Sequence, residues 1–159
     1  MLQSIPSYDI SCPIPDTPLA QTKDLPWLGL LAGYSRILSR TYENLFSAKA
    51  RSLPKDSLQV ATDVVFGELE SWRLSVPEDF RPGLPIRTHR LGNLMTTSLA
   101  VQLHLYYYNV RIGALRVALQ TCSNETESYS EYRRSLTETG EGIAGLVHLI
   151  PLEAFASPW

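Results

Sequence analysis

The stretch LAVQLHLYYYNVRIGALRVAL, from Leu99 to Leu119, decides the fold of this chain. Apolar residues occur on nearly every face of the helix that it would form. Such a helix is either a membrane span or the buried centre of a helical domain, and ~20 residues are enough to cross a bilayer. Arg111 lies near the middle of the stretch, however, and a charge at mid-membrane costs at least ~2.5–3.5 kcal/mol. We therefore interpret it as the buried helix of a soluble domain.

The composition excludes several classes of protein. The chain has 159 residues, which fits one domain or part of a larger one, and its 44% hydrophobic content is enough for a packed core. Fourteen basic and 16 acidic residues give a net charge of -2, so no general attraction to nucleic acid or to an anionic membrane follows. Two cysteines, Cys12 and Cys122, cannot hold zinc unaided, and together with the lack of a secretory signal they indicate an intracellular protein.

Prolines and helix-capping residues divide the first part of the chain. Residues 1–24 are rich in proline and are predicted to form an extended segment. An amphipathic helix of about 25 residues follows, with Asp24 as its cap, Pro26 in its first turn and Pro54 beyond its end. The apolar side chains of its buried face recur at spacings of three and four: Leu30, Leu31, Tyr34, Ile37, Leu38, Tyr42, Leu45 and Phe46.

Three further helices are predicted. One begins at Asp56, with Gln59 where a capping box places it, and ends at Ser75. A loop runs to about Arg90, and the long apolar helix then extends from Asn93 or Thr96 to about Thr121, before a last helix from near Ser128. No alternating strand pattern or internal repeat is present. The sequence thus predicts an all-α fold over residues 25–159, with about four helices arranged around the long apolar one.

No motif in the sequence indicates catalysis or metal binding. Residues 140–145, GEGIAG, match the dinucleotide pattern GxGxxG, but the residues before them have a helical pattern, so we interpret them as a chance match or a helix-packing surface. His89, His104 and His148 have no partner at ligand spacing. His104 is interpreted as a hydrogen-bonded histidine of the core. We expect no enzyme activity, no metal site and no cofactor in this chain.

The aromatic residues of the long helix offer one candidate site. Trp72 and the tyrosine triplet are candidates to line a pocket between helices. Because consecutive helical residues point ~100° apart, the three tyrosines cannot all face one site, and core packing is the favoured interpretation. The candidate residues for an effector pocket or for helix packing are Trp72, His104, Tyr106, Tyr107, Tyr108 and Arg111.

Five stretches, taken in their order along the chain, form a recognisable series. Residues 69–82 read LESWRLSVPEDFRP, and residues 103–107 read LHLYY. Residues 5–16, residues 35–50 and the helix after Cys122 complete the series. In this order they resemble the fungal-specific transcription factor domain, which is the middle homology or xylanolytic-activator-type regulatory region of zinc-cluster transcription factors. The resemblance extends from about residue 5 to the end and departs at Arg116-Val117, where the family usually has Arg-Pro.

The resemblance implies a function. The chain would be the C-terminal part of that regulatory domain, acting in the nucleus on transcription by RNA polymerase II through contacts with other parts of the regulator, with coregulator proteins or with a small-molecule effector. Zinc and DNA binding belong to full-length family members, whose six-cysteine cluster has no counterpart here, so no residue is assigned to either. No contact with membrane is expected. The alternatives are an effector-sensing helical module and an unrelated protein-interaction domain.

One consequence concerns the long helix itself. The chain begins near the middle of the regulatory domain that it resembles, so part of this helix would lack its natural cover. An exposed apolar patch favours association. We therefore expect the isolated chain to self-associate.

Overall fold

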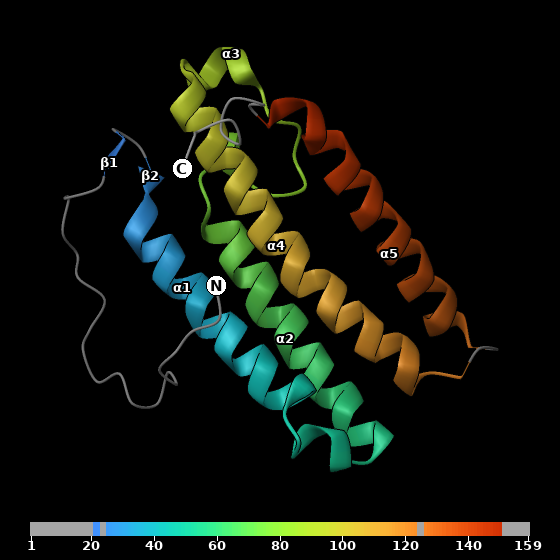
Figure 1. Cartoon of the computed structure of the whole chain (residues 1–159). Helices are drawn as coiled ribbons and strands as arrows, with labels where there is room; N and C mark the ends of the chain where they lie inside the picture. The colour runs from blue at the N-terminus through green and yellow to red at the C-terminus, as the bar shows by residue number, and fades with distance from the viewer. Residues whose placement is uncertain (1–20, 23–24, 124–125, 151–159) are drawn as a thin grey trace, which may run out of the picture.

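The computed structural model describes residues 21–22, 25–123 and 126–150. Over these residues the fold is all-α, as predicted, apart from a two-residue antiparallel pairing of β1 with β2 (Figure 1). The long helices are α1 (Trp27–Thr41), α2 (Lys55–Ser75), α4 (Leu94–Thr121) and α5 (Glu127–Leu146). The shorter elements are β1 (Gln21–Thr22), β2 (Leu25–Pro26) and α3 (Thr88–Leu91). Most of the predicted extended segment lies outside the described residues, and the boundary at residue 24 stays a prediction.

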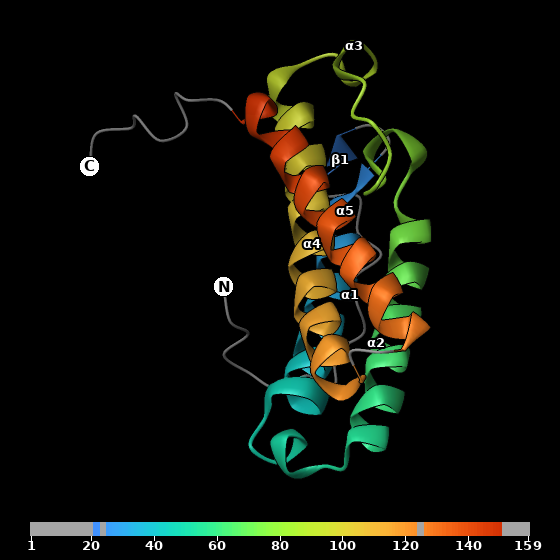
Figure 2. The same cartoon turned by 90° about the vertical axis from the view of Figure 1, so that its right-hand side faces the viewer.

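Helix α4 is the centre of the molecule. The four long helices run up and down in succession, with α2 and α4 between α1 and α5 in Figure 1, and α5 leaning towards α2 in Figure 2. Side chains are buried round most of the circumference of α4, and a stripe that includes Gln102, Asn109 and Arg116 is left exposed. The interpretation of this stretch as a buried helix is therefore confirmed. None of the helices described has the length and apolar content that a bilayer crossing needs.

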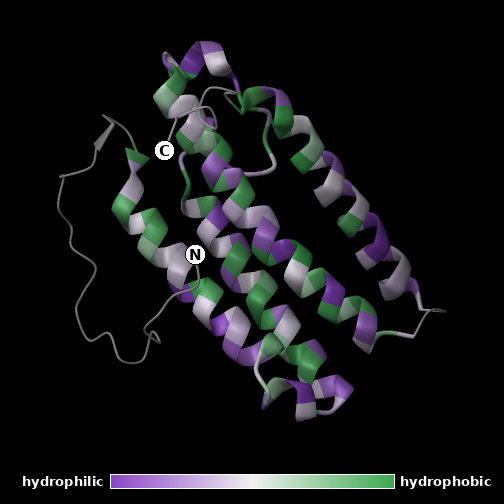
Figure 3. Cartoon of the chain, in the orientation of Figure 1, coloured by the Kyte–Doolittle hydropathy of each residue, from purple (hydrophilic) through white to green (hydrophobic). Residues whose placement is uncertain are grey.

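Apolar side chains from α1, α2 and α4 form the core. Val65 and Leu69 of α2 and Leu103 and Val110 of α4 are at most 2% exposed and belong to one cluster. Full burial of each such side chain contributes about 1.5–3 kcal/mol. In Figure 3 the hydrophobic colour recurs along these helices, whereas α5 is largely polar. Only Thr139 and Leu146 of α5 are buried, so α5 contributes fewer fully buried side chains than each of the other three long helices.

The first helix is shorter than predicted. Its α-helical part ends at Thr41, and the chain continues as a π-helical turn, Tyr42–Phe46, before a 3-10 turn, Ala50–Ser52. A π turn has wider hydrogen-bond spacing than an α-helix, so it changes which side chains face inward. Leu45 stays buried, but Tyr42 and Phe46, both predicted for the buried face, are 56% and 40% exposed.

The cap predicted for α2 is wrong, and the cap predicted for α1 falls outside the described residues. Pro54, not Asp56, occupies the cap position of α2, and no side chain caps it. Gln59 therefore makes no capping box; its amide nitrogen donates to the Tyr132 hydroxyl (2.8 Å), and its oxygen accepts from Thr121 Oγ1 (2.9 Å). Asp24, the cap predicted for α1, is outside the described residues, and Pro26 holds that position.

The predicted start of the long helix is confirmed. Asn93 is the N-cap of α4, and its Oδ1 accepts a hydrogen bond from the Thr96 backbone N–H at 2.9 Å. This bond satisfies one of the donors that a helix N-terminus leaves unpaired. The loop before it, predicted to be irregular, contains α3 and a 3-10 turn, Glu78–Phe80.

The glycine motif lies inside α5 and brings that helix close to α4. A Cβ on Gly142 would lie 2.5 Å from the Tyr108 hydroxyl oxygen, whereas a Cβ on Gly140 or Gly145 would meet nothing within 4 Å. The residues directly before these glycines belong to α5 and not to a strand, so the glycines cannot form a dinucleotide-binding turn. The interpretation as a helix-packing surface is correct for Gly142.

Alanine at the three glycines is expected to separate packing from helix propensity. Gly140→Ala and Gly145→Ala should raise the free energy of unfolding by up to ~1 kcal/mol, because alanine favours the helix. Gly142→Ala should lower it, because Tyr108 is only 8% exposed and has little room to move away. Urea denaturation of the three variants measures this, and equal stabilisation by all three would contradict the close packing at Gly142.

Candidate functional site

Five of the six predicted site residues fall into two groups on different sides of α4. Trp72 and Tyr106 lie towards α1, where both rings pack on Tyr34. Tyr107, Tyr108 and Arg111 line a cleft between α2 and α5. The rotation of ~100° per residue along a helix explains why adjacent tyrosines are separated in this way.

The group beside α1 is part of the packed core. The Trp72 indole N–H donates to the Leu30 carbonyl oxygen at 2.9 Å. The rings of Tyr34 and Tyr106 stack with centroids 4.5 Å apart, and the Tyr106 hydroxyl accepts from the Gln102 amide at 2.7 Å. The Asn109 side-chain amide donates to the Tyr34 hydroxyl at 3.2 Å, and burial raises the pKa of Tyr34. These polar atoms are satisfied by the protein itself, so Trp72 and Tyr106 act in packing here.

The cleft consists of two cavities that meet at α4. One, of about 470 Å³, is polar and lies beside the end of α2. The other, of about 250 Å³, is lined mainly by apolar and aromatic side chains. Glu70, Tyr107 and Arg111 line both cavities and therefore mark the point where they join.

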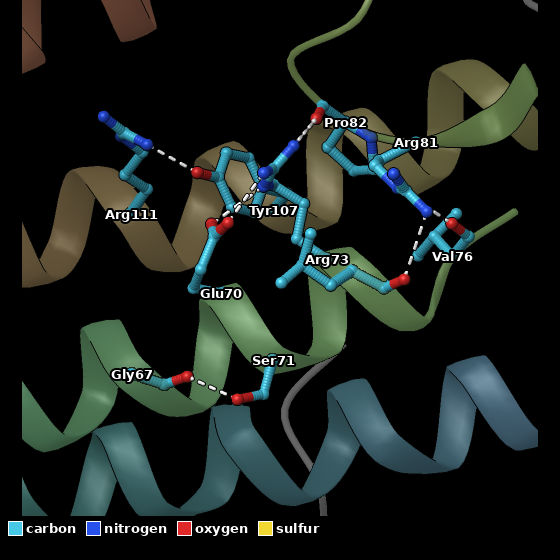
Figure 4. A network of polar contacts seen from close by, with 10 residues as sticks. Gly67, Glu70, Ser71, Arg73, Val76, Arg81, Pro82, Tyr107 and Arg111 are labelled. Carbon is cyan, nitrogen blue, oxygen red and sulfur yellow. Dashed lines mark hydrogen bonds and ion pairs between the residues drawn. The ribbon is translucent and has the colours of Figure 1, made fainter. Parts of the chain in front are cut away.

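Arg73 and Glu70 form one wall of the polar cavity. The Arg73 guanidinium donates to both carboxylate oxygens of Glu70, at 2.8 and 2.6 Å, and to the Pro82 carbonyl oxygen at 3.2 Å (Figure 4). The hydrogen bonds from Arg73 lower the pKa of Glu70. Arg81 donates to the carbonyls of Val76 and Leu74 and so holds the loop after α2. This network fixes the position of the wall.

Arg111 differs from Arg73 in having no carboxylate partner. Its Nη1 donates to the hydroxyl of Tyr107, and its guanidinium carbon lies 5.6 Å from the centroid of that ring. Within the part of the chain that the structure describes, no acidic side chain lies within 4 Å of its charged nitrogens. Arg111 therefore brings to the junction of the two cavities a guanidinium without a carboxylate hydrogen-bond partner, and its charge contributes to lowering the pKa of Glu70.

The sequence interpretation missed part of this site. Glu70 and Arg73 are three residues apart on α2, a spacing that predicts an ion pair, so this wall was readable from the sequence. Phe66 and Tyr132, whose rings stack with centroids 6.3 Å apart, come from α2 and α5 and meet only in the folded chain. No local pattern could have joined them.

His104 is buried, as predicted, and hydrogen bonds satisfy its ring only in part. It is 3% exposed, and its Nε2 has no hydrogen-bond partner. Its ring meets the Tyr108 ring edge-on, with centroids 6.2 Å apart. Burial lowers the pKa of His104 to about 4, although a backbone contact with Arg81 acts in the opposite direction. The imidazole is thus neutral at neutral pH. No group of three or more His, Cys, Asp or Glu residues suited to a metal ion occurs in the described ranges.

His104 should make stability depend on pH. Its pKa is depressed in the folded chain, so the unfolded chain binds the extra proton first, and stability should fall as the pH drops from about 6.5 towards 4. The full loss is about 3 kcal/mol. Urea denaturation at several pH values should show a shallower fall for His104→Gln than for the wild type, whereas His89→Gln, at an exposed site, should match the wild type. An equal fall in the free energy of unfolding with decreasing pH in the wild type and both variants would refute this role of His104.

Comparisons with known proteins find two similar transcription factors. The chain is 32% identical over 106 residues to the ABC-transporter-regulating transcription factor of Aspergillus oryzae, which is 66% of this chain and 12% of that protein. It is 34% identical over 76 residues to the protein of the same name from Aspergillus fumigatus, which is 48% of this chain and 8% of that protein. No protein-family model and no solved structure matches. This chain is therefore similar to a small part of two fungal transcription factors.

Proposed function

We propose that this chain is a regulatory part of a fungal transcription factor that acts in the nucleus without touching DNA. The observation that carries the proposal is the similarity to two fungal proteins named as transcription factors, one of them over 66% of this chain. Transcription factors of this kind are not enzymes, and we propose no catalytic role. The chain spans 12% or less of either relative, so a share in the activity of those whole proteins is part of this proposal.

The placement of two motifs supports a fungal-specific regulatory domain. The LESWRLSVPEDFRP motif begins in α2 and ends in the loop after it, and the LHLYY motif lies in α4. Tyr34 packs on both, through Trp72 of the first and Tyr106 of the second. Residues that define the resemblance thus share one core, as expected of motifs that specify a common fold.

The surface charge favours protein contacts over DNA contacts. The net charge is -2, and three arginines, Arg40, Arg73 and Arg90, are paired with acidic side chains. A DNA-binding face needs a dense group of free cations. We propose that the partners are other parts of the same regulator or coregulator proteins. Self-association stays a prediction, and the exposed Leu94, Met95 and Leu105 of α4 are consistent with it.

A second candidate function is effector sensing. The cleft between α2 and α5 favours it, because the cleft contains a cation without a carboxylate partner beside an apolar cavity. This function is compatible with the first, since a regulator can respond to a small molecule.

A reporter assay and a mobility-shift assay test the proposal together. The chain fused to an unrelated DNA-binding domain should change reporter expression in a fungal host relative to that domain alone. Trp72→Ala, which empties a buried site and costs ~3–5 kcal/mol, should abolish the change. The isolated chain should not retard duplexes from upstream of ABC-transporter genes. An unchanged reporter or tight, sequence-specific retardation would contradict the proposal.

A further inference from the structure

The two cavities that join at Arg111 have complementary chemistry. The polar cavity presents Arg111, Tyr107 and Tyr108 from α4, and the apolar one presents Phe66 and Leu69 of α2, Leu115 of α4 and Tyr132 of α5. Their volumes, about 470 and 250 Å³, suit a small organic molecule. A ligand in both would place one end beside a guanidinium and the other among aromatic rings.

Arg111 is suited to binding a carboxylate. A guanidinium presents a planar fork of N–H donors that matches the two oxygens of a carboxylate. Only Nη1 of Arg111 has an acceptor, the Tyr107 hydroxyl, among the residues that the structure describes. The neighbouring carboxylate, Glu70, is already engaged by Arg73 through two hydrogen bonds. The remaining donors of Arg111 are therefore available to a ligand.

The opposite wall limits the charge that the ligand can carry. Glu138 and Glu141 of α5 line the polar cavity and are exposed. Like charges repel, so for a phosphate or a dicarboxylate the repulsion from these glutamates would offset the attraction to Arg111. A single negative charge with an apolar body fits the site better.

From these contacts we propose that the cleft between α2 and α5 binds a small amphipathic monocarboxylate. Its carboxylate pairs with Arg111, and its apolar body lies in the apolar cavity against Phe66 and Tyr132. As an effector site this rests on the proposed regulatory function, but the binding itself does not, so the two can fail separately. The ligand would touch α2, α4 and α5 and so would tie the weakly held α5 to the rest of the fold.

Calorimetric titration of the 159-residue chain tests this proposal. Octanoate and 2-naphthoate are the probes, with octanamide and 2-naphthamide as uncharged analogues and inorganic phosphate as an anion without an apolar body. At pH 7.5 at least one carboxylate should bind saturably, with a dissociation constant on the order of a millimolar or tighter. The uncharged amide analogue of that carboxylate should bind roughly tenfold more weakly or not at all, and so should inorganic phosphate.

Two arginine variants locate the site. Arg111→Gln should weaken carboxylate binding roughly tenfold or more, because it removes the charged donor. Arg116→Gln, at an exposed position of the same helix that does not line the cleft, should bind as the wild type does. If Arg111→Gln does not fold, Arg111→Lys keeps the charge and the aliphatic stem but loses the fork, and it should bind several-fold more weakly.

Several results would overturn the proposal. They are the absence of saturable binding by either carboxylate, equal binding of amide and carboxylate, equal binding of phosphate, and wild-type affinity in the folded Arg111 variant. None of them bears on the reporter assay, which uses no added ligand. A silent reporter together with carboxylate binding would refute the regulatory role and leave the site in place.

Discussion

The central constraint on this structure is that α4 has apolar side chains on several sides, all of which must be buried by other helices. A helix with apolar residues round its circumference cannot lie on a surface with one face in water, and here α1, α2 and α5 bury all but a stripe that includes Gln102, Asn109 and Arg116. This constraint also distributes the aromatic residues. Tyr106 joins the core on the α1 side, whereas Tyr107 and Tyr108 face the cleft between α2 and α5. The candidate site is thus a consequence of how α4 is covered.

Much of this was predictable from the sequence, and the errors have physical causes. The apolar run and its Asn93 cap defined α4 because both signals are local. The π turn at Tyr42–Phe46 was missed, because the spacing of its apolar residues still matched an α-helix. The position of Gln59 predicts a capping residue, but its partners, Tyr132 and Thr121, are 73 and 62 residues away. In the site, the Glu70–Arg73 pair has a readable spacing, whereas contacts between α2 and α5 depend on the complete fold.

The helices are unequally held, and this bears on function. Helix α5 buries only Thr139 and Leu146 and approaches α4 closely at Gly142, opposite Tyr108. Elements with few buried apolar contacts open at a lower free energy than the core does. A regulatory domain needs an element whose position can respond to a partner or an effector. The cleft runs along the edge of α5, so the proposed carboxylate site lies where binding would most affect that helix.

Native-state hydrogen exchange tests most directly whether α4 is the centre on which the other helices depend. Amides in the middle of α4, around Leu103 to Val110, should exchange only through global unfolding, with the same urea dependence as the denaturation curve. Amides of α5, such as those near Thr139, should exchange through a smaller opening at lower free energy. Protection in α5 equal to that in α4, or exchange in the middle of α4 before α5 opens, would contradict this account.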